Sequence, residues 1–429
     1  MMLKSLRWLA AALLGCFLLG TTPLYAQTET PPDPMPLLDE GEYDIENFLL
    51  MGADQSNPNN LGRTDALMIV SVNMTVGTAS FLSIPRDLWV YIPNIGTAKI
   101  NTAYASGVNS GGSGIELLSD TIRYNLGIQI DHYARINFSG FKELVDALGG
   151  IEVAVDCAIQ DWRLREPDLD PTVEDNWEMF TLPVGMQSMD GNLALWYARS
   201  RRTSSDFDRG RRQQVIMRAI WQRIRALNLW DQATDIFPQL TELVTTDLST
   251  QDMLRYVPLA ATIDSSRIAA YTFRPNVEVT FSQSVDGQSI LLPVRESITT
   301  LEQQMMQPPT ESELVREHAN IEVVNASGIP GLGRVAVERL SWEGFVPQLS
   351  QETPPFQSAM TLYDFTGQRK GGSLQVLSQV LRVSPDSVII QPDPNRTVDF
   401  RVIIGGDYHT CTHNVLLPTE TPTTESSGG

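Results

Sequence analysis

Short runs of the chain alternate apolar and polar residues with a period of two, which is typical of strands that bury one face. Other stretches repeat their apolar residues at helical spacing, and the pair Gly149-Gly150 ends one of them. Strands are predicted at residues 47–51, 66–73 and 78–84, the last two joined by the short turn 74–77. Helices are predicted at residues 115–125 and 138–148. Further helical stretches near 232–262 and strand-like segments up to Pro293 complete a first α/β domain.

A second group of segments follows a connector that contains Pro308-Pro309. Its strands are predicted at residues 321–325, 359–363 and 398–404, and its helices at 335–340 and 374–381. This alternation predicts a small α/β domain, which we expect to fold independently and to contribute no catalytic group.

The chain has 429 residues, which is enough for two or three folded units. We expect a signal peptide at 1–26, a proline-rich tether at 27–45, a first domain at 46–301, a linker at 302–320, a second domain at 321–407 and a disordered tail at 408–429. A basic start and the apolar run 8–19 indicate the signal peptide, with cleavage after Ala26. An uncleaved anchor extending through Leu24 and a lipoprotein modified at Cys16 are the alternatives.

Once a signal peptide is removed, only two cysteines remain, Cys157 and Cys411. Two cysteines permit one disulfide in an oxidising compartment, but they cannot build a disulfide framework or a zinc site. The sequence favours the interpretation that they are two separate thiols.

The arginines of this acidic chain are concentrated in one segment. The formal charge is −20, yet nine arginines lie between residues 199 and 225, with Asp206 and Asp208 as the only acids among them. They are Arg199, Arg201, Arg202, Arg209, Arg211, Arg212, Arg218, Arg223 and Arg225. Because the protein as a whole repels anions, the cluster predicts a short-range clamp for a phosphate or carboxylate. The net charge and the lack of interleaved aromatic residues argue against nucleic acid as a partner.

The spacing within this segment suggests how the clamp is built. Residues 195–201 are predicted to form a short strand, which would place Arg199 and Arg201 on one face at its end. A helix is predicted at 209–225, with Arg209 and Gln213 one turn apart. Donors from a strand end and from a helix start would then surround one anion.

Three residues outside the cluster are expected beside it. If the three first strands pair antiparallel, Asp54, Asp65 and Arg86 lie at the same end of the sheet. Two carboxylates at one edge, without a neighbouring His or Cys, suit an oxygen-coordinated Mg²⁺ ion. For either aspartate alone, capping of a turn is the alternative.

These residues belong to five motifs whose order and spacing resemble those of the LytR-CpsA-Psr family, over about residues 47–301. The motifs are Gly52-Ala53-Asp54, Gly62-Arg63-Thr64-Asp65, Ser83-Ile84-Pro85-Arg86-Asp87, Lys99-Ile100-Asn101-Thr102-Ala103-Tyr104, and Tyr197-Ala198-Arg199-Ser200-Arg201 with Asp206-Phe207-Asp208-Arg209 and Gln213. Residues 321–407 resemble the LytR C-terminal domain.

The resemblance implies a three-layer α/β/α domain with a mixed central sheet, followed by a small α/β domain. It also implies an extracytoplasmic phosphotransferase, secreted or held at the outer face of the cytoplasmic membrane. Such an enzyme moves a glycopolymer from a polyprenyl-pyrophosphate carrier to a peptidoglycan hydroxyl and forms a phosphodiester.

By position, Asp54 and Asp65 match Mg²⁺-associated aspartates. The residues that match pyrophosphate-binding groups are Arg86, Arg199, Arg201, Arg209 and Gln213, with Arg63 and Lys99 as supporting positions. The expected catalytic residues are Asp65, Arg86, Arg199 and Arg201.

Other functions stay open from the sequence. One is hydrolysis of the pyrophosphate lipid, with water in place of the acceptor hydroxyl, and another is a regulator that binds anionic polymer without catalysis. For a general base, Asp65, Asp206 and Asp208 are equal candidates. The predicted helices within 115–148 and at 213–225 could line an apolar slot for the polyprenyl tail, although their apolar stripes are equally explained as ordinary core.

Overall fold

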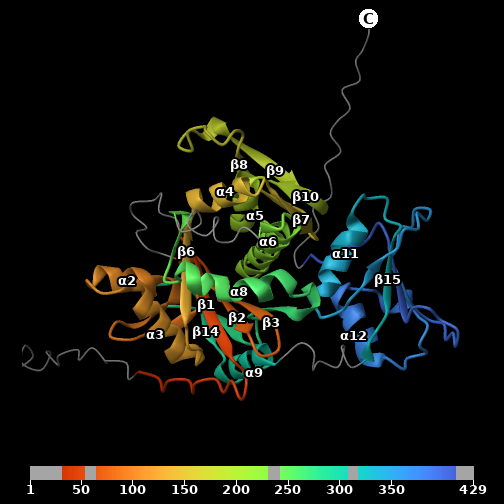
Figure 1. Ribbon diagram of the computed structural model, residues 1–429. Coiled ribbons are helices and arrows are strands. Elements are labelled where there is room, and N and C mark those ends of the chain that lie inside the picture. The colour runs from red at the N-terminus through yellow and green to blue at the C-terminus, as the bar shows by residue number, and fades with distance from the viewer. Residues whose placement is uncertain (1–30, 54–63, 230–241, 308–316, 412–429) are drawn as a thin grey trace, which may run out of the picture. The chain divides into compact units, whose positions relative to one another are not determined.

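The computed structural model describes residues 31–53, 64–229, 242–307 and 317–411. A six-stranded mixed sheet forms the centre of the first domain (Figure 1), in the order β11-β6-β1-β2-β3-β12. Its strands are β1 (Ile45–Ala53), β2 (Thr64–Asn73), β3 (Thr78–Ser83), β6 (His132–Asn137), β11 (Val244–Thr246) and β12 (Ile268–Thr272). β1, β2 and β3 pair antiparallel, whereas β6 and β12 run parallel to β1 and β3. The three strands predicted near the start of the chain are therefore confirmed.

Helices cover both faces of this sheet, as the alternation in β1 requires. Leu49 and Met51 are buried in a core that they share with α3 (Gly114–Leu126) and α9 (Arg295–Met306). Phe48 points to the opposite face, where its ring packs edge-on against Tyr256 of α8 (Thr250–Thr262). The long helix α6 (Asp206–Ala226) lies on the same side as α8, since the indole N–H of Trp221 donates to the C=O of Ala260 at 2.8 Å. This layering confirms the α/β fold with a mixed central sheet.

A second core lies beside the sheet and supports the shorter elements of the first domain. Val145, Tyr197 and Ile216, from three different helices, are buried in it. The helices not yet named are α2 (Ala103–Asn109), α4 (Phe138–Ala147) and α5 (Gly191–Arg199). The two-stranded ribbons are β4 (Trp89–Ile92) with β5 (Gly96–Lys99), β7 (Ile151–Val155) with β10 (Gly185–Met189), β8 (Ile159–Leu164) with β9 (Trp177–Leu182), and β13 (Val279–Gln283) with β14 (Ser289–Pro293).

The strand predicted at residues 195–201 is wrong, because most of this segment belongs to helix α5. The Asp190 carboxylate caps that helix by accepting from a backbone N–H of its first turn at 2.8 Å. Ala194 and Tyr197 stand three residues apart and both face the core, which is helical rather than strand periodicity. Arg199 therefore lies in the last turn of α5, where the helix dipole favours a cation.

Two segments that the sequence predicted to be a tether and a linker are instead packed against the core of the first domain. Met35, inside the predicted tether, is buried, and its N–H donates to the C=O of Tyr124 at 2.8 Å. At the other boundary, residues 302–306 of the predicted linker are the last turns of α9, where Met305 is buried. In both places apolar side chains on a short segment were enough to bind it to the core.

The predicted signal peptide at 1–26 and the proline pair of the linker lie outside the described residues. Among the helices that the structure describes, none combines the length and the apolar character that a membrane span needs.

The second domain has its own five-stranded sheet, in the order β16-β15-β19-β17-β18. Its strands are β15 (Ile321–Asn325), β16 (Gln348–Leu349), β17 (Thr361–Asp364), β18 (Val388–Ile390) and β19 (Phe400–Ile404), and its helices are α11 (Leu332–Ser341) and α12 (Gly371–Val380). Leu340, Leu377 and Phe400 meet in its core. The strands and helices predicted for this region, and the small α/β unit they imply, are confirmed.

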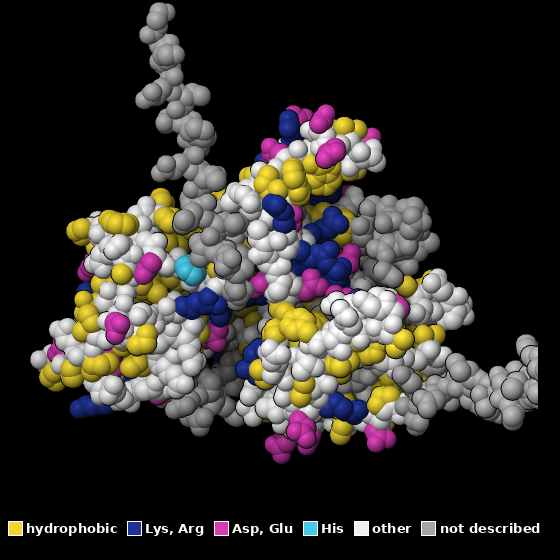
Figure 2. All heavy atoms as spheres, turned by 180° about the vertical axis from the view of Figure 1, so that it is seen from behind, with side chains coloured by type: hydrophobic (Ala, Val, Ile, Leu, Met, Phe, Trp, Pro, Cys, Tyr) yellow, Lys and Arg dark blue, Asp and Glu magenta, His cyan; other side chains and the backbone are white. Residues whose placement is uncertain are grey.

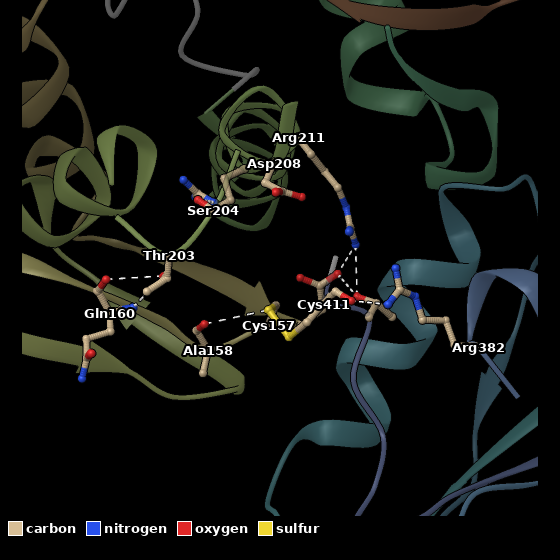
Figure 3. The surroundings of a disulfide bond; sticks show 12 residues. Cys157, Ala158, Gln160, Thr203, Ser204, Asp208, Arg211, Arg382 and Cys411 are labelled. Carbon is tan, nitrogen blue, oxygen red and sulfur yellow. Dashed lines mark hydrogen bonds and ion pairs between the residues drawn. A yellow bond between two sulfur atoms is a disulfide. The ribbon is translucent and has the colours of Figure 1, made fainter. Parts of the chain in front are cut away.

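A disulfide joins the end of the second domain to the first (Figure 3). Cys157 and Cys411 are bonded although 254 positions separate them, so the interpretation as two separate thiols is wrong. Tyr408, Thr410 and Cys411 are buried, so the predicted disordered tail does not begin at residue 408. Only the fold brings two such distant cysteines together, which is why their spacing in the sequence could not decide the pairing.

Polar and ring contacts add to the disulfide. Glu338 of α11 lies 3.7 Å from Arg218 of α6 and accepts from the Gln222 amide at 3.1 Å. The Arg218 guanidinium also lies 5.1 Å from the ring centroid of Trp342. The second domain is thus bound to α6 rather than held by a tether alone, and its independent folding stays a prediction.

Candidate active site

A cavity of about 1260 Å³ opens where α5 ends and α6 begins. Four arginines that the sequence selected line it, and two of the four aspartates in its lining were also singled out from the sequence. They are Arg86, Arg199, Arg201 and Arg209, with Asp65 and Asp206. Figure 2 shows basic side chains gathered in a hollow on one face of the molecule, below a projecting tip that carries hydrophobic side chains. Residues from three separate stretches of the sequence thus meet on one surface.

The strand pairing places Asp65 and Arg86 together as predicted. The N–H of Ile84 donates to the C=O of Leu67 at 2.9 Å, so the start of β2 lies beside the end of β3. The Arg86 guanidinium then reaches Oδ1 of Asp65 at 3.1 Å. Asp206 and Asp87 lie 3.4 and 3.6 Å from the same guanidinium. Burial alone lowers the pKa of Arg86, but the three carboxylates more than offset it, so the pKa is raised and Arg86 stays charged.

The end of β1 reaches the same edge of the sheet, because Gly52 stands opposite Ala66 and Ala53 opposite Thr64. Asp54 and Arg63 themselves lie outside the described residues. The predicted metal pair of Asp54 and Asp65 therefore stays a prediction.

Arg209 is held at the start of α6 by local sequence signals. Ser205 and Asp208 form a capping box, each accepting from the other's backbone N–H, which fixes the first turn. Arg209 is only 6% exposed, and its Nη1 lies 3.2 Å from Oδ1 of Asp206. Burial lowers the pKa of Arg209 to about 10, with Arg86 acting in the same direction and Asp206 opposing it. The group is still protonated at neutral pH.

Gly210 explains how α6 comes close enough to Arg86. A Cβ atom at this position would lie 3.0 Å from the Cβ of Ser83 at the end of β3. The Ser83 hydroxyl donates to the C=O of Gly210 at 3.2 Å, which holds the helix at this short separation. The missing side chain of Gly210 thus allows Arg209 to approach the residues that follow β3.

Arg199 and Arg201 reach the cavity from a helix end and from the loop after it. The Arg199 guanidinium lies 4.1 Å from the ring centroid of Phe138. Nη1 of Arg201 lies 3.8 Å from Asp206, and its backbone N–H donates to the Asp161 carboxylate at 2.9 Å. Asp206 is consequently shared by three arginines, which holds their positive groups close together.

Gln213 and Lys99 lie near this site without lining the large cavity. Gln213 borders a smaller adjoining pocket together with Asp65, Arg86 and Arg209. Nζ of Lys99 lies 2.8 Å from Oδ1 of Asp87, the neighbour of Arg86 in the chain. The roles predicted for both residues stay predictions.

Only part of the nine-arginine cluster faces the cavity. Arg199, Arg201, Arg202 and Arg209 line it, whereas the other five are bonded elsewhere in the protein. Their partners are Asp156 and Thr410 for Arg211; the carbonyls of Tyr197 and Ser200 and the hydroxyl of Ser204 for Arg212; Glu338 for Arg218; the Leu148 carbonyl for Arg223; and the Ile263 carbonyl for Arg225. The interpretation of the whole cluster as an anion clamp is therefore too broad.

Sequence reasoning missed two residues that shape the site, Phe138 and Asp161. Phe138 begins the predicted helix α4, and its apolar character pointed to the core rather than to an arginine partner. Asp161 accepts from the backbone N–H groups of Arg201 and Arg202 at 2.9 and 3.2 Å. No local signal links it to residues 40 positions further along the chain, so only the fold could identify it.

Comparison with known proteins gives a consistent result for both domains. The sequence model described as the LytR_cpsA_psr family matches residues 27–307, and the model described as LytR cell envelope-related transcriptional attenuator matches residues 318–408.

Among characterised relatives, the chain is 30% identical over 241 residues to the polyisoprenyl-teichoic acid–peptidoglycan teichoic acid transferase TagT of Bacillus subtilis, which covers 54% of this chain and 70% of TagT. It is 34% identical over 212 residues to TagU of Enterococcus faecalis, a transferase with the same description, covering 48% of this chain and 63% of TagU. The crystal structure of B. subtilis TagV superposes with a TM-score of 0.50 at 23% identity, covering 61% of this chain and 96% of TagV, which supports the fold.

Proposed function

The chain belongs to the LytR-CpsA-Psr family, and from this premise we propose that it transfers a glycopolymer from a polyprenyl-pyrophosphate carrier to a hydroxyl of peptidoglycan, forming a phosphodiester. The names of TagT and TagU describe that type of transfer for teichoic acid. The observation that carries the proposal is the convergence of Arg86, Arg199, Arg201 and Arg209 on one cavity.

The arginines would bind the pyrophosphate and stabilise the charge that develops during transfer. Guanidinium groups donate paired hydrogen bonds to phosphate oxygens, and phosphoryl transfer depends mainly on positioning and charge neutralisation. Arg209 lies in the first turn of α6, where backbone N–H groups and the helix dipole also favour an anion. In the proposed reaction the acceptor hydroxyl attacks the sugar-linked phosphorus and polyprenyl phosphate leaves.

The donor set at Arg86 fits the proposed Mg²⁺ cofactor. Asp65 and Asp206 both approach this guanidinium and both line the cavity, and carboxylate oxygens are the ligands that Mg²⁺ prefers. We propose Asp65, together with Asp54, as the residues that would hold the ion. When bound, Mg²⁺ would neutralise phosphate charge. Among the described residues no group of three or more His, Cys, Asp or Glu side chains is arranged so that it could hold a metal ion by itself, so the substrate would supply further oxygen ligands.

The structure narrows the candidates for the general base. The Asp208 carboxylate accepts from the N–H and the hydroxyl of Ser205 at 3.0 and 2.7 Å and is therefore already hydrogen-bonded within the N-terminal cap of α6. Asp65 and Asp206 line the cavity instead. We propose that one of these two accepts the proton of the acceptor hydroxyl.

We place the reaction outside the cytoplasm. The Cys157–Cys411 disulfide supports this location, because structural disulfides persist mainly in oxidising compartments. A lipid-linked donor and a peptidoglycan acceptor would bring the protein to the outer face of the cytoplasmic membrane.

The test is a transfer assay with the full chain. A prenyl-pyrophosphate-linked oligosaccharide is incubated with peptidoglycan oligomers and Mg²⁺, and the products are analysed by mass spectrometry. The expected product is peptidoglycan that carries the oligosaccharide through a phosphodiester, and the Arg209→Ala variant, with strongly reduced activity, is the control. Release of phosphorylated oligosaccharide without attachment would identify a hydrolase. Binding of the donor without any product would identify a non-catalytic polymer-binding protein.

A further inference from the structure

The large cavity extends beyond the arginines, between α5 and the ribbon of β8 and β9. One stripe of α5 lines it at helical spacing, running from Asn192 through Leu195 and Trp196 to Arg199. The ribbon contributes Trp162 and Trp177 among its lining residues. A volume of about 1260 Å³ exceeds what a pyrophosphate needs, since sites for whole drug-sized ligands measure about 300–1,000 Å³. The cavity therefore has room for a second part of the ligand beyond the pyrophosphate.

The aromatic side chains in this half are ordered by hydrogen bonds within the protein. The indole N–H of Trp196 donates to the C=O of Trp162 at 2.9 Å, and that of Trp177 donates to the C=O of Pro171 at 3.0 Å. Trp196 also packs edge-on against Phe180, at 5.2 Å between ring centroids. Because the N–H groups of two indoles are satisfied, these rings offer a ligand their carbon surface.

Polar side chains share the lining of this cavity with the aromatic rings. They belong to Lys142, Arg163, Arg165 and Asn192. A polyprenyl chain needs a continuous apolar lining, because burying these polar groups against hydrocarbon would leave them without partners. A pyranose ring has an apolar C–H face and a rim of hydroxyls, and matches a cavity that offers both aromatic rings and hydrogen-bonding groups.

We propose that Trp162, Trp177 and Trp196 form a saccharide subsite that continues from the arginines. This inference rests on the proposed transferase function, because it assigns the subsite to a glycan of that reaction. The sugar rings could come from the donor, directly attached to the pyrophosphate, or from the peptidoglycan acceptor. Both sources present the same chemistry to the rings, and they differ in whether a phosphate is attached.

Trp162 offers the most direct test, because its side chain is 52% exposed and its removal leaves the core intact. The Trp162→Ala variant of the full chain is compared with Phe356→Ala, which removes another exposed ring, 67% exposed, in the second domain. Four probes are titrated by calorimetry: inorganic pyrophosphate, a phosphate-free peptidoglycan tetrasaccharide, a soluble short-prenyl pyrophosphate with one sugar attached, and the same prenyl pyrophosphate without the sugar.

Trp162→Ala should weaken binding of at least one sugar-containing probe by about three- to tenfold, the range expected for one aromatic contact. Binding of inorganic pyrophosphate should not change, and Phe356→Ala should match the parent with every probe. Trp162→Phe should recover part of the affinity. An effect confined to the tetrasaccharide assigns the subsite to the acceptor, and an effect confined to the prenyl probe assigns it to the donor, provided that the same prenyl pyrophosphate without sugar binds both proteins equally.

Two results would overturn the subsite. One is unchanged binding of both sugar-containing probes, and the other is an equal loss for prenyl pyrophosphate that lacks the sugar, which would show that the groove holds the lipid. If the tetrasaccharide binds through Trp162 but no transfer product forms in the assay above, the subsite stands and the proposed function fails.

Discussion

Two sets of arginines in one short segment have different tasks. Arg199, Arg201 and Arg209 line the cavity and lie at the end of α5, in the following loop and in the first turn of α6. Arg211 and Arg212 follow directly in α6, yet they bind the protein itself. The sequence does not separate the two sets, because they share the same residue type, the same segment and the same acidic background. The two sets differ in their positions relative to the end of α5 and the start of α6, and in whether their guanidinium groups face the cavity or bind other groups of the protein.

The second set positions the first. Arg212 is buried and donates to the C=O of Tyr197 and to the hydroxyl of Ser204, both at 3.0 Å, and also to the C=O of Ser200. These acceptors lie at and after the end of α5, where helical carbonyls lack partners within the helix. Arg212 thereby fixes the loop that carries Arg201. The comparison predicts that variants of the two sets fail in different assays.

The largest effect is expected for Arg209, in the cavity-facing set. Arg209→Ala should lower kcat/KM of transfer by about 10² to 10³, the range for loss of one preorganised charge-stabilising donor. Transfer rates from a lipid-linked oligosaccharide provide the measurement. Arg225→Ala is the matched control, since Arg225 belongs to the same helix and donates to the Ile263 carbonyl. Equal losses in both variants would contradict the division into two sets.

A smaller effect, on stability rather than on turnover, is expected from removing the disulfide. The double variant Cys157→Ser with Cys411→Ser should lose about 2–4 kcal/mol of unfolding free energy, because the unfolded chain gains freedom. Neither cysteine lines the large cavity, so transfer at low temperature should stay near the parent rate. Urea unfolding and the transfer assay measure the two quantities. A variant that unfolds like the parent would show that the bond contributes nothing to the stability of this region.

Arg212→Leu should reduce the free energy of unfolding by about 2 kcal/mol, because buried carbonyls at the end of α5 lose their donor. Calorimetric melting compares it with Arg225→Leu, which removes the same charge from a more exposed position of the same helix. The prediction fails if the two variants melt at the same temperature.

The smallest effect concerns pH. Burial alone raises the pKa of the Asp156 carboxyl, but Arg211 and Thr410 more than offset it, so the pKa lies below the ordinary value of 3.8. A lowered pKa stabilises the fold fully above about pH 3.8, and this contribution is lost as the pH falls through the folded-state value. Asp156→Asn should therefore be about 1 kcal/mol less stable than the parent at pH 6, and the difference should shrink below pH 4. Urea midpoints at a series of pH values provide the measurement, and a difference that does not vary with pH would contradict the role of this pair.

The sequence predicted most of the regular structure, because local patterns report local geometry. Strand alternation identified β1, β2 and β3, and together with the turn at 74–77 it placed Arg86 at the same edge as Asp65, now seen 3.1 Å apart. Helical spacing identified α6 and the one-turn separation of Arg209 and Gln213. Antiparallel pairing and helical periodicity fix such distances within a few residues of the chain, so they need no knowledge of the rest of the fold.

The tertiary structure alone decided which partners each residue meets across the chain. The sequence predicts a strand over the last residues of α5 because two arginines two positions apart imitate strand periodicity, whereas the core contacts of Tyr197 require a helix. The disulfide, the ion pair of Arg211 with Asp156 and the hydrogen bond from Trp196 to the C=O of Trp162 each join segments that are far apart in the sequence. Such contacts depend on how whole helices and strands pack against one another. The local sequence around an arginine at a helix start is the same whether its guanidinium faces a ligand, a carbonyl or a second domain, so it cannot identify the partner.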